Sequence, residues 1–170
     1  MADTAVRIPA WAIRKGGQLV KRLCVIYHSQ SGATAQLAEA VKQGASAEEG
    51  IEVILKRAME ASVDDLLSAD AVIFGSPENF GYLSGGLKDF FDRSFYPALP
   101  RQLNLSYGVF ISAGNDGSGA VRQLERILSG YPMKPVAEAV IVKGLPSKEG
   151  FKACEDLGAT LAAGLAFGIF

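Results

Sequence analysis

The fold is decided by the stretch Val25-Ile26-Tyr27-His28-Ser29-Gln30-Ser31-Gly32-Ala33-Thr34-Ala35-Gln36-Leu37-Ala38-Glu39-Ala40-Val41. Its apolar start predicts a buried strand that ends at Tyr27. Ala33, Leu37 and Val41 then follow at the spacing of one face of a helix. A strand that turns through a short polar loop into a helix brings free backbone N–H groups and the positive end of the helix dipole together. The stretch therefore predicts an anion-binding site.

The residue types in this loop indicate that the anion is a phosphate. Ser29, Ser31 and Thr34 can each donate a hydroxyl hydrogen, and Gly32 lets a ligand approach the backbone. No Lys or Arg lies between Tyr27 and Val41, so the lysine of a G-x-x-x-x-G-K-[ST] loop is missing. A G-x-G-x-x-G dinucleotide motif is absent as well. One terminal phosphate monoester held by neutral donors fits best; the alternative is an ordinary serine-rich helix cap.

Composition favours one globular domain without nucleic acid or membrane partners. Of 170 residues, 49% are hydrophobic and 21% are charged, and the net charge of −1 offers no general attraction to nucleic acid. No apolar run reaches the ~20 residues of a membrane span, and no signal peptide is visible. Cys24 and Cys154 are expected to be buried and reduced, which favours a cytoplasmic location. A metal site is not expected, because His28 is the only histidine.

Five strands are predicted, each followed by a helix. They cover residues 23–27, 51–55, 70–75, 107–112 and 136–142. This alternation predicts an α/β fold with a five-stranded parallel sheet and helices on both faces. Residues 1–21 are expected to be an N-terminal extension and residues 22–170 the domain.

Helix boundaries show local signals. Ser62 is a candidate N-cap for a short helix, and the first long helix is expected at 33–47. The last helix is expected to begin near Ser147 and to be interrupted at Gly158 or Gly164. The apolar residues 165–170 are then either a flap on the core or an oligomer contact.

The opening stretch resembles the phosphate-binding signature of the flavodoxins, which has an apolar and aromatic strand end, hydroxyl residues, a small residue and Thr before the helix. Tyr27, Ser29, Gly32, Thr34, Ala38 and Val41 occupy those places. The resemblance implies a flavodoxin-like fold with strand order 2-1-3-4-5 and FMN as cofactor. The loops after strands one, three and four would then share the edge of the sheet at which the cofactor binds.

The second loop shows a further resemblance. Residues 77–85, followed by Lys88-Asp89-Phe90, are similar to the corresponding region of NAD(P)H:quinone reductases related to the tryptophan-repressor-binding protein. With the flavodoxins and the NADPH-dependent FMN reductases, these form the flavodoxin-like family that the chain resembles. An aromatic-Gly pair contacts the isoalloxazine in the quinone reductases, which implies the same for Phe80 and Gly81. The chain differs from those reductases in having no histidine beyond His28, and from flavodoxins in lacking a strongly acidic composition.

Three loops are therefore expected to form the cofactor site. Pro77 would stiffen the second loop, its aromatic residues would cover the flavin, and the third loop would offer backbone amides. The expected cofactor-binding residues are Ser29, Gln30, Ser31, Gly32, Ala33 and Thr34, then Pro77, Glu78, Asn79, Phe80, Gly81 and Tyr82, then Ala113, Gly114, Asn115, Asp116 and Gly117.

The resemblance implies an oxidoreductase that passes reducing equivalents from NAD(P)H through FMN to a quinone-like or other small acceptor. No side chain is expected to act as acid or base, because N5 of the flavin carries the chemistry and the Gly81 backbone modulates it. One alternative is an electron carrier between redox partner proteins, and another is a flavin- or phosphate-binding regulatory module without turnover. Homo-oligomerisation is left open by the apolar C-terminal tail.

Overall fold

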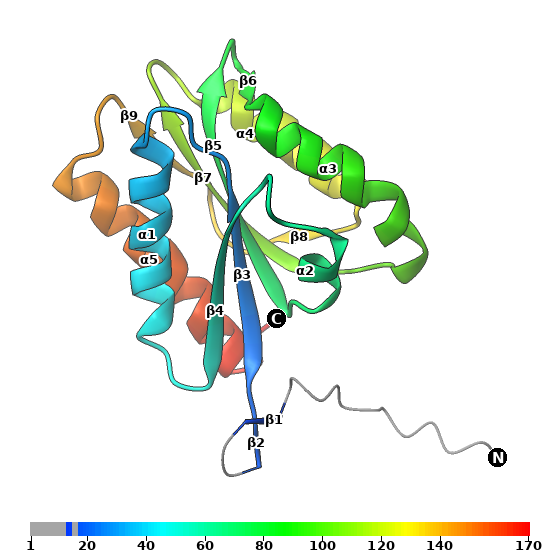
Figure 1. Cartoon of the computed structure of the whole chain (residues 1–170). Coiled ribbons are helices and arrows are strands. Elements are labelled where there is room, and N and C mark those ends of the chain that lie inside the picture. The colour runs from blue at the N-terminus through cyan, green and yellow to red at the C-terminus, as the bar shows by residue number, and fades with distance from the viewer. Residues whose placement is uncertain (1–12, 15–16) are drawn as a thin grey trace.

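A parallel β-sheet forms the middle layer of the molecule, with helices against both faces (Figure 1). The computed structural model describes residues 13–14 and 17–170. Most of the expected extension thus lies outside the described residues, and the division at residue 22 stays a prediction. The two short antiparallel strands β1 (Ile13–Arg14) and β2 (Gln18–Leu19) pair with each other and not with the main sheet.

The main sheet confirms the expected strand order. Its central order is β4-β3-β5-β7, and both β8 and β9 pair with the outer side of β7, all in parallel. This order is 2-1-3-4-5 when β8 and β9 are taken together as the fifth position. The strands are β3 (Lys21–Tyr27), β4 (Ile51–Arg57), β5 (Ala71–Asn79), β7 (Ser106–Ala113), β8 (Lys134–Pro135) and β9 (Val140–Lys143).

The helices divide between the two faces as right-handed crossovers require. Helices α1 (Ala33–Ser46) and α5 (Lys148–Ala166) cover one face and contact each other along their lengths. The other face carries α2 (Val63–Leu67), α3 (Gly85–Ala98) and α4 (Ser118–Gly130), with the short 3₁₀ helix η2 (Leu99–Arg101) after α3. Ser62 caps α2 as expected, in a capping box with Asp65. In the described part of the chain, no helix is long and apolar enough to cross a membrane.

Two hydrophobic cores lie on either side of the sheet because successive strand residues alternate between its faces. In β3, Leu23 and Val25 belong to the core under α1 and α5, whereas Cys24 and Ile26 belong to the core under α2, α3 and α4. Burial raises the pKa of the Cys24 thiol to about 12, and that of Cys154 likewise, as expected for inert buried cysteines.

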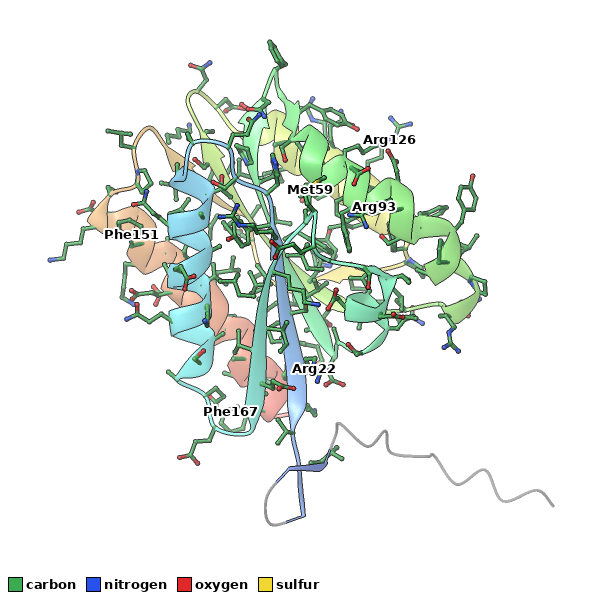
Figure 2. All side chains as sticks on the ribbon, in the orientation of Figure 1. Arg22, Met59, Arg93, Arg126, Phe151 and Phe167 are labelled. Atoms are coloured by element: carbon green, nitrogen blue, oxygen red, sulfur yellow. The ribbon has the colours of Figure 1, made fainter. Side chains whose placement is uncertain are left out.

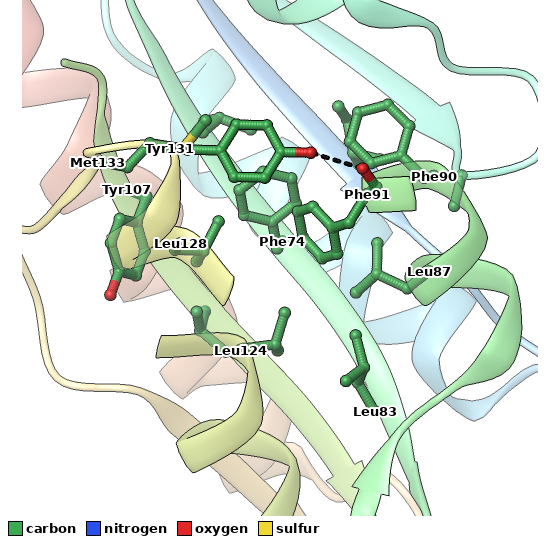
Figure 3. Close-up of a cluster of buried hydrophobic side chains, with 14 of the residues drawn as sticks. Phe74, Leu83, Leu87, Phe90, Phe91, Tyr107, Leu124, Leu128, Tyr131 and Met133 are labelled. Atoms are coloured by element: carbon green, nitrogen blue, oxygen red, sulfur yellow. Dashed lines mark hydrogen bonds between the residues drawn. The ribbon is translucent and has the colours of Figure 1, made fainter. Parts of the chain in front are cut away.

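The second of these cores is aromatic (Figure 3). The rings of Phe74 and Phe91 lie 5.0 Å apart, and Phe91 meets Tyr131 edge-on at 5.8 Å between ring centroids. The hydroxyl of Tyr131 donates to the Phe91 carbonyl at 2.7 Å, and burial raises its pKa to about 12. These contacts fix α3 and α4 next to each other, and both helices begin at the edge where the loops gather.

Three expectations about the elements are corrected. The fifth strand is split into β8 and β9, which pair with opposite ends of β7, and residues 136–139 connect them. Strand β5 continues to Asn79 and turns back as β6 (Tyr82–Leu83). Helix α5 is unbroken, because its glycines serve close packing. A Cβ on Gly158 would lie 2.0 Å from the Val41 carbonyl oxygen of α1.

The C-terminal tail covers part of the core, which is one of its two expected roles. The ring of Phe170 packs back on Gly164, where a Cβ would lie 2.1 Å from it, so part of the tail covers the core. Phe167 and Ile169 are 76% and 75% exposed (Phe167 is labelled in Figure 2). Self-association through these two side chains stays a prediction.

Candidate functional site

The loops after β3, β5 and β7 meet at one edge of the sheet, at the top of Figure 1. They do so because parallel strands all end on the same side, and because the chain crosses from one face to the other beside β3. The structure therefore brings the three groups of predicted residues to a single edge. Side-chain hydrogen bonds link the three loops to one another.

The first loop leaves the N-terminus of α1 open. Gly32 is the N-cap residue at φ 99°, and no side chain accepts a bond from the first-turn N–H groups in the described part of the chain. Thr34 is buried in that first turn, with an exposed fraction of 2%. The Ser29 hydroxyl oxygen accepts from the Gly32 N–H at 3.2 Å, which closes the loop and leaves the hydroxyl hydrogen to donate elsewhere.

Every other α-helix of the described chain has a partner at its N-terminus. Ser62, Ser84 and Ser147 cap α2, α3 and α5 with their own hydroxyl oxygens. Helix α4 is capped by a carboxylate from another element, that of Glu78. The donors of α1 thus remain free for an anion, and a Cβ built on Gly32 would meet nothing within 4 Å, so the space beside the backbone is open. This donor set fits a phosphate monoester.

The second loop is a β-hairpin rather than an irregular turn. Glu78 pairs with Leu83 and Asn79 with Tyr82, so Phe80 and Gly81 are the two central turn residues, at φ 53° and 69°. Two consecutive positive φ angles belong to the turns that suit the twist of a hairpin. A phenylalanine there is unusual, and its side chain is fully exposed. Phe80 is thus an aromatic surface held at the tip of the edge, and its contact with a flavin stays a prediction.

Buried serines close the base of this hairpin. The Ser84 N–H donates to the Ser76 hydroxyl oxygen at 2.9 Å, and the two hydroxyl oxygens lie 3.2 Å apart. Ser84 also caps α3 through the Leu87 N–H. The first turn of α3 is therefore joined rigidly to the hairpin, while Pro77 and Tyr82 are partly buried along its sides.

Two of the predicted cofactor residues connect the hairpin to its neighbours. The Asn79 amide donates to the Gln30 side-chain oxygen at 2.9 Å, which links the second loop to the first. The Glu78 carboxylate accepts from the N–H groups of Gly117 at 3.0 Å and Ala120 at 3.2 Å, which links the second loop to the third. Because the side chains of Asn79 and Glu78 already make hydrogen bonds within the protein, their binding of a cofactor stays a prediction.

The third loop has buried ends and an exposed middle. Ala113 is the last residue of β7, and Gly117 is buried against Ile141 as the N-cap residue of α4. Between them, residues 114–116 are exposed. The Asp116 carboxylate accepts from the backbone N–H and the hydroxyl of Ser118, so it belongs to the turn into α4.

The packing of His28 on the start of α3 was not predicted from the sequence. Its backbone N–H donates to the Gly75 carbonyl at 3.0 Å, and its ring lies on Gly86, where a Cβ would be 2.4 Å from ring atom Cδ2. Its Nδ1 is buried without a partner in the described chain. Burial lowers the pKa of His28, and the charge of Arg57 lowers it further. In the sequence, the adjacent pair Gly85-Gly86 was the signal that could have predicted a close approach of another residue to this helix.

The exit of β4 is held beside these loops by α3. The Arg93 guanidinium donates to the carbonyl oxygens of Ala58 at 2.9 Å and Ala61 at 3.1 Å (Arg93 and nearby Met59 are labelled in Figure 2). Met59 within this segment is 62% exposed. A further segment thus borders the edge on the side of β4.

Comparisons with known proteins agree with this geometry. Residues 30–145 match the family described as NADPH-dependent FMN reductase. A flavodoxin of Aquifex aeolicus is 34% identical over 157 residues, which cover 83% of this chain and 85% of that protein. An NAD(P)H dehydrogenase (quinone) of Acidithiobacillus ferrooxidans is 35% identical over 148 residues, 75% of this chain and 72% of that protein.

Solved structures share the fold. An archaeal flavodoxin superposes with a TM-score of 0.72 at 22% identity, covering 84% of this chain and 96% of its own. A flavodiiron core from Synechocystis gives a TM-score of 0.74 at 24% identity, with 88% of this chain and 37% of its own. The match over residues 30–145 includes most of the first loop and all of the second and third. The chain therefore belongs to the NADPH-dependent FMN reductase family and has the flavodoxin-like fold.

Proposed function

We propose that the protein is an FMN-binding oxidoreductase that passes reducing equivalents from NAD(P)H to a quinone-like or other small acceptor. The observation that carries this proposal is the open N-terminus of α1, surrounded by hydroxyl groups and without a Lys or Arg. Family membership and the relatives named as quinone dehydrogenases support it.

Each loop would have a separate task in holding FMN. The first-turn N–H groups of α1 and the hydroxyls of Ser31 and Thr34 would bind the phosphate, because they have no other partner in the described chain. The exposed ring of Phe80 would cover one face of the isoalloxazine, and the backbone of residues 114–116 would meet its polar edge. Bound FMN would supply electron and hydride transfer, and the protein contributes binding and orientation.

The experiment is anaerobic mixing of the FMN-loaded protein with NADPH or NADH, followed by a quinone such as menadione. Rapid loss of the oxidised flavin absorbance, with its return on quinone addition, is expected. A flavin that neither nucleotide reduces would contradict the enzymatic part of the proposal. Titration of the flavin-free protein with FMN and with riboflavin tests the phosphate assignment separately. FMN is expected to bind more tightly, and equal affinities would exclude a phosphate site.

A second candidate is an electron carrier between redox proteins, which the relative named flavodoxin favours, since the alignment covers 85% of its length. In that case NAD(P)H would leave the flavin oxidised, and a chemical reductant would reduce it in two well-separated one-electron steps. A redox partner protein would then replace the small acceptor. A cytoplasmic location remains part of the proposal in either case.

A further inference from the structure

Glu78 was predicted as a cofactor ligand, yet both of its carboxylate oxygens accept bonds from the start of α4. Oε1 lies 3.0 Å from the Gly117 nitrogen and Oε2 lies 3.2 Å from the Ala120 nitrogen. The N-cap residue of α4 is Gly117, which has no side chain, and the neighbouring Asp116 accepts from the Ser118 N–H, so Glu78 takes the N–H groups of Gly117 and Ala120. A carboxylate at this place is favoured by the free N–H groups and by the helix dipole. These two bonds are called the Glu78 bridge below.

The turn of the hairpin also rests on α4. A Cβ built on Gly119 would lie 2.2 Å from the Gly81 carbonyl oxygen and 3.1 Å from the Gly81 Cα. Only a glycine in the first turn of α4 therefore allows the hairpin to come so close. Since Glu78 lies three residues before Gly81, the bridge and this contact hold the same short segment against the same helix turn.

We propose that Glu78 is a positioning residue: the Glu78 bridge holds the β5–β6 hairpin on α4 and thereby sets the direction in which the Gly81 peptide faces. The carbonyl of Gly81 points at Gly119, and rotation of that peptide would have to move it away from α4. The Glu78 bridge and the contact through Gly119 therefore restrain the turn together with the β5–β6 pairing. The consequence for flavin chemistry rests on the proposed function, whereas the bridge itself does not.

The first arm of the test uses flavin-free protein and follows thermal unfolding. Glu78→Ala is expected to lower the melting temperature by about 2–8 °C, as loss of a helix cap does in a chain of this size. Gly119→Ala is expected to lower it as well, because the new methyl collides with the Gly81 carbonyl. Gly85→Ala is the matched control in the first turn of α3, since its Cβ would meet nothing within 4 Å. The double variant of Glu78 and Gly119 should lose less than the sum, because a released hairpin can move away from the methyl. Additive losses would overturn the proposal.

The second arm uses flavin. Glu78→Ala is expected to weaken FMN and riboflavin by the same factor, about 5–30-fold, because the hairpin serves the ring and not the phosphate. A loss confined to FMN would make Glu78 a phosphate contact and would overturn the positioning role. Glu78→Gln keeps the reach and one acceptor oxygen, so it should bind flavin more tightly than Glu78→Ala; equal losses would mean that charge alone matters.

The reduction potential of the bound flavin separates positioning from simple stability. Gly119→Ala changes no charge, so a shift that it shares in direction with Glu78→Ala reports the position of the hairpin. Gly85→Ala, at a residue outside the predicted cofactor contacts, should leave the potential unchanged. Unchanged potentials in both the Glu78 and Gly119 variants would overturn the proposal. If wild-type protein bound no flavin at all, the proposed function would fail, while the unfolding experiment would still decide whether the bridge exists.

Discussion

Replacing Gly86 by Ala should disturb the phosphate loop through the ring of His28. The added Cβ would lie 2.4 Å from Cδ2 and 2.6 Å from Nε2 of His28. Ordinary carbon contacts need about 3.5–4.0 Å, so the ring must move by about 1 Å. Overpacking of this kind costs about 1–3 kcal/mol, which lowers the melting temperature of a chain of this size by about 2–12 °C. Thermal unfolding of the flavin-free protein measures this loss.

Gly85→Ala is the matched control, because a Cβ there would meet nothing within 4 Å in the same helical turn. Its melting temperature should stay close to that of the wild type. The Gly86 variant should also bind FMN more weakly, because His28 is joined to Ser29 of the phosphate loop. Removing the ring in a His28→Ala background should relieve most of the cost of Gly86→Ala. The reasoning would be refuted if both glycine variants melted alike, or if His28→Ala gave no relief.

The remaining predictions concern the loops themselves. Thr34→Ala should weaken FMN by about 10–100-fold and leave riboflavin nearly unchanged, since it removes a hydrogen bond to a charged phosphate worth about 1.5–3 kcal/mol. Equal losses for the two ligands would speak against the phosphate assignment. Gly32→Val should abolish tight FMN binding, because a β-branched residue at φ 99° is strained and fills the open side of the loop; normal binding would exclude that loop as the phosphate site. Gly81→Ala should keep FMN but make its first reduction potential more negative by about 40 mV, the equivalent of one neutral hydrogen bond; weaker binding at unchanged potentials would reject this role. Because the folded state lowers the pKa of His28, its neutral form contributes stability above about pH 6.5 that is lost as the pH falls below that value. Wild-type melting temperatures should therefore fall more between pH 7 and pH 5 than those of His28→Asn, and parallel curves would contradict this.

The sequence alone was enough to predict the layers of the fold and the order of the strands in the sheet. Apolar runs such as residues 23–27 predict strands, and the Ser62 cap with Asp65 marks a helix start, because both signals are local. The order 2-1-3-4-5 followed from the resemblance of the first loop, and the pairing of β4, β3, β5 and β7 confirms it. The open start of α1 was predicted in the same way, since the hydroxyls and the missing lysine are all within one short stretch.

Tertiary structure decided what the polar and small side chains between those signals do. Glu78 caps a helix that begins about 40 residues later in the chain, and no local pattern encodes that partner. The hairpin turn places Phe80 at positive φ without an Asn-Gly pair to predict it. Gly86, Gly119 and Gly158 are required by His28, Gly81 and Val41, which come from other elements. Local periodicity determines which face of an element is buried, whereas a close approach between two backbones depends on how distant elements pack, and only the folded chain brings those surfaces together.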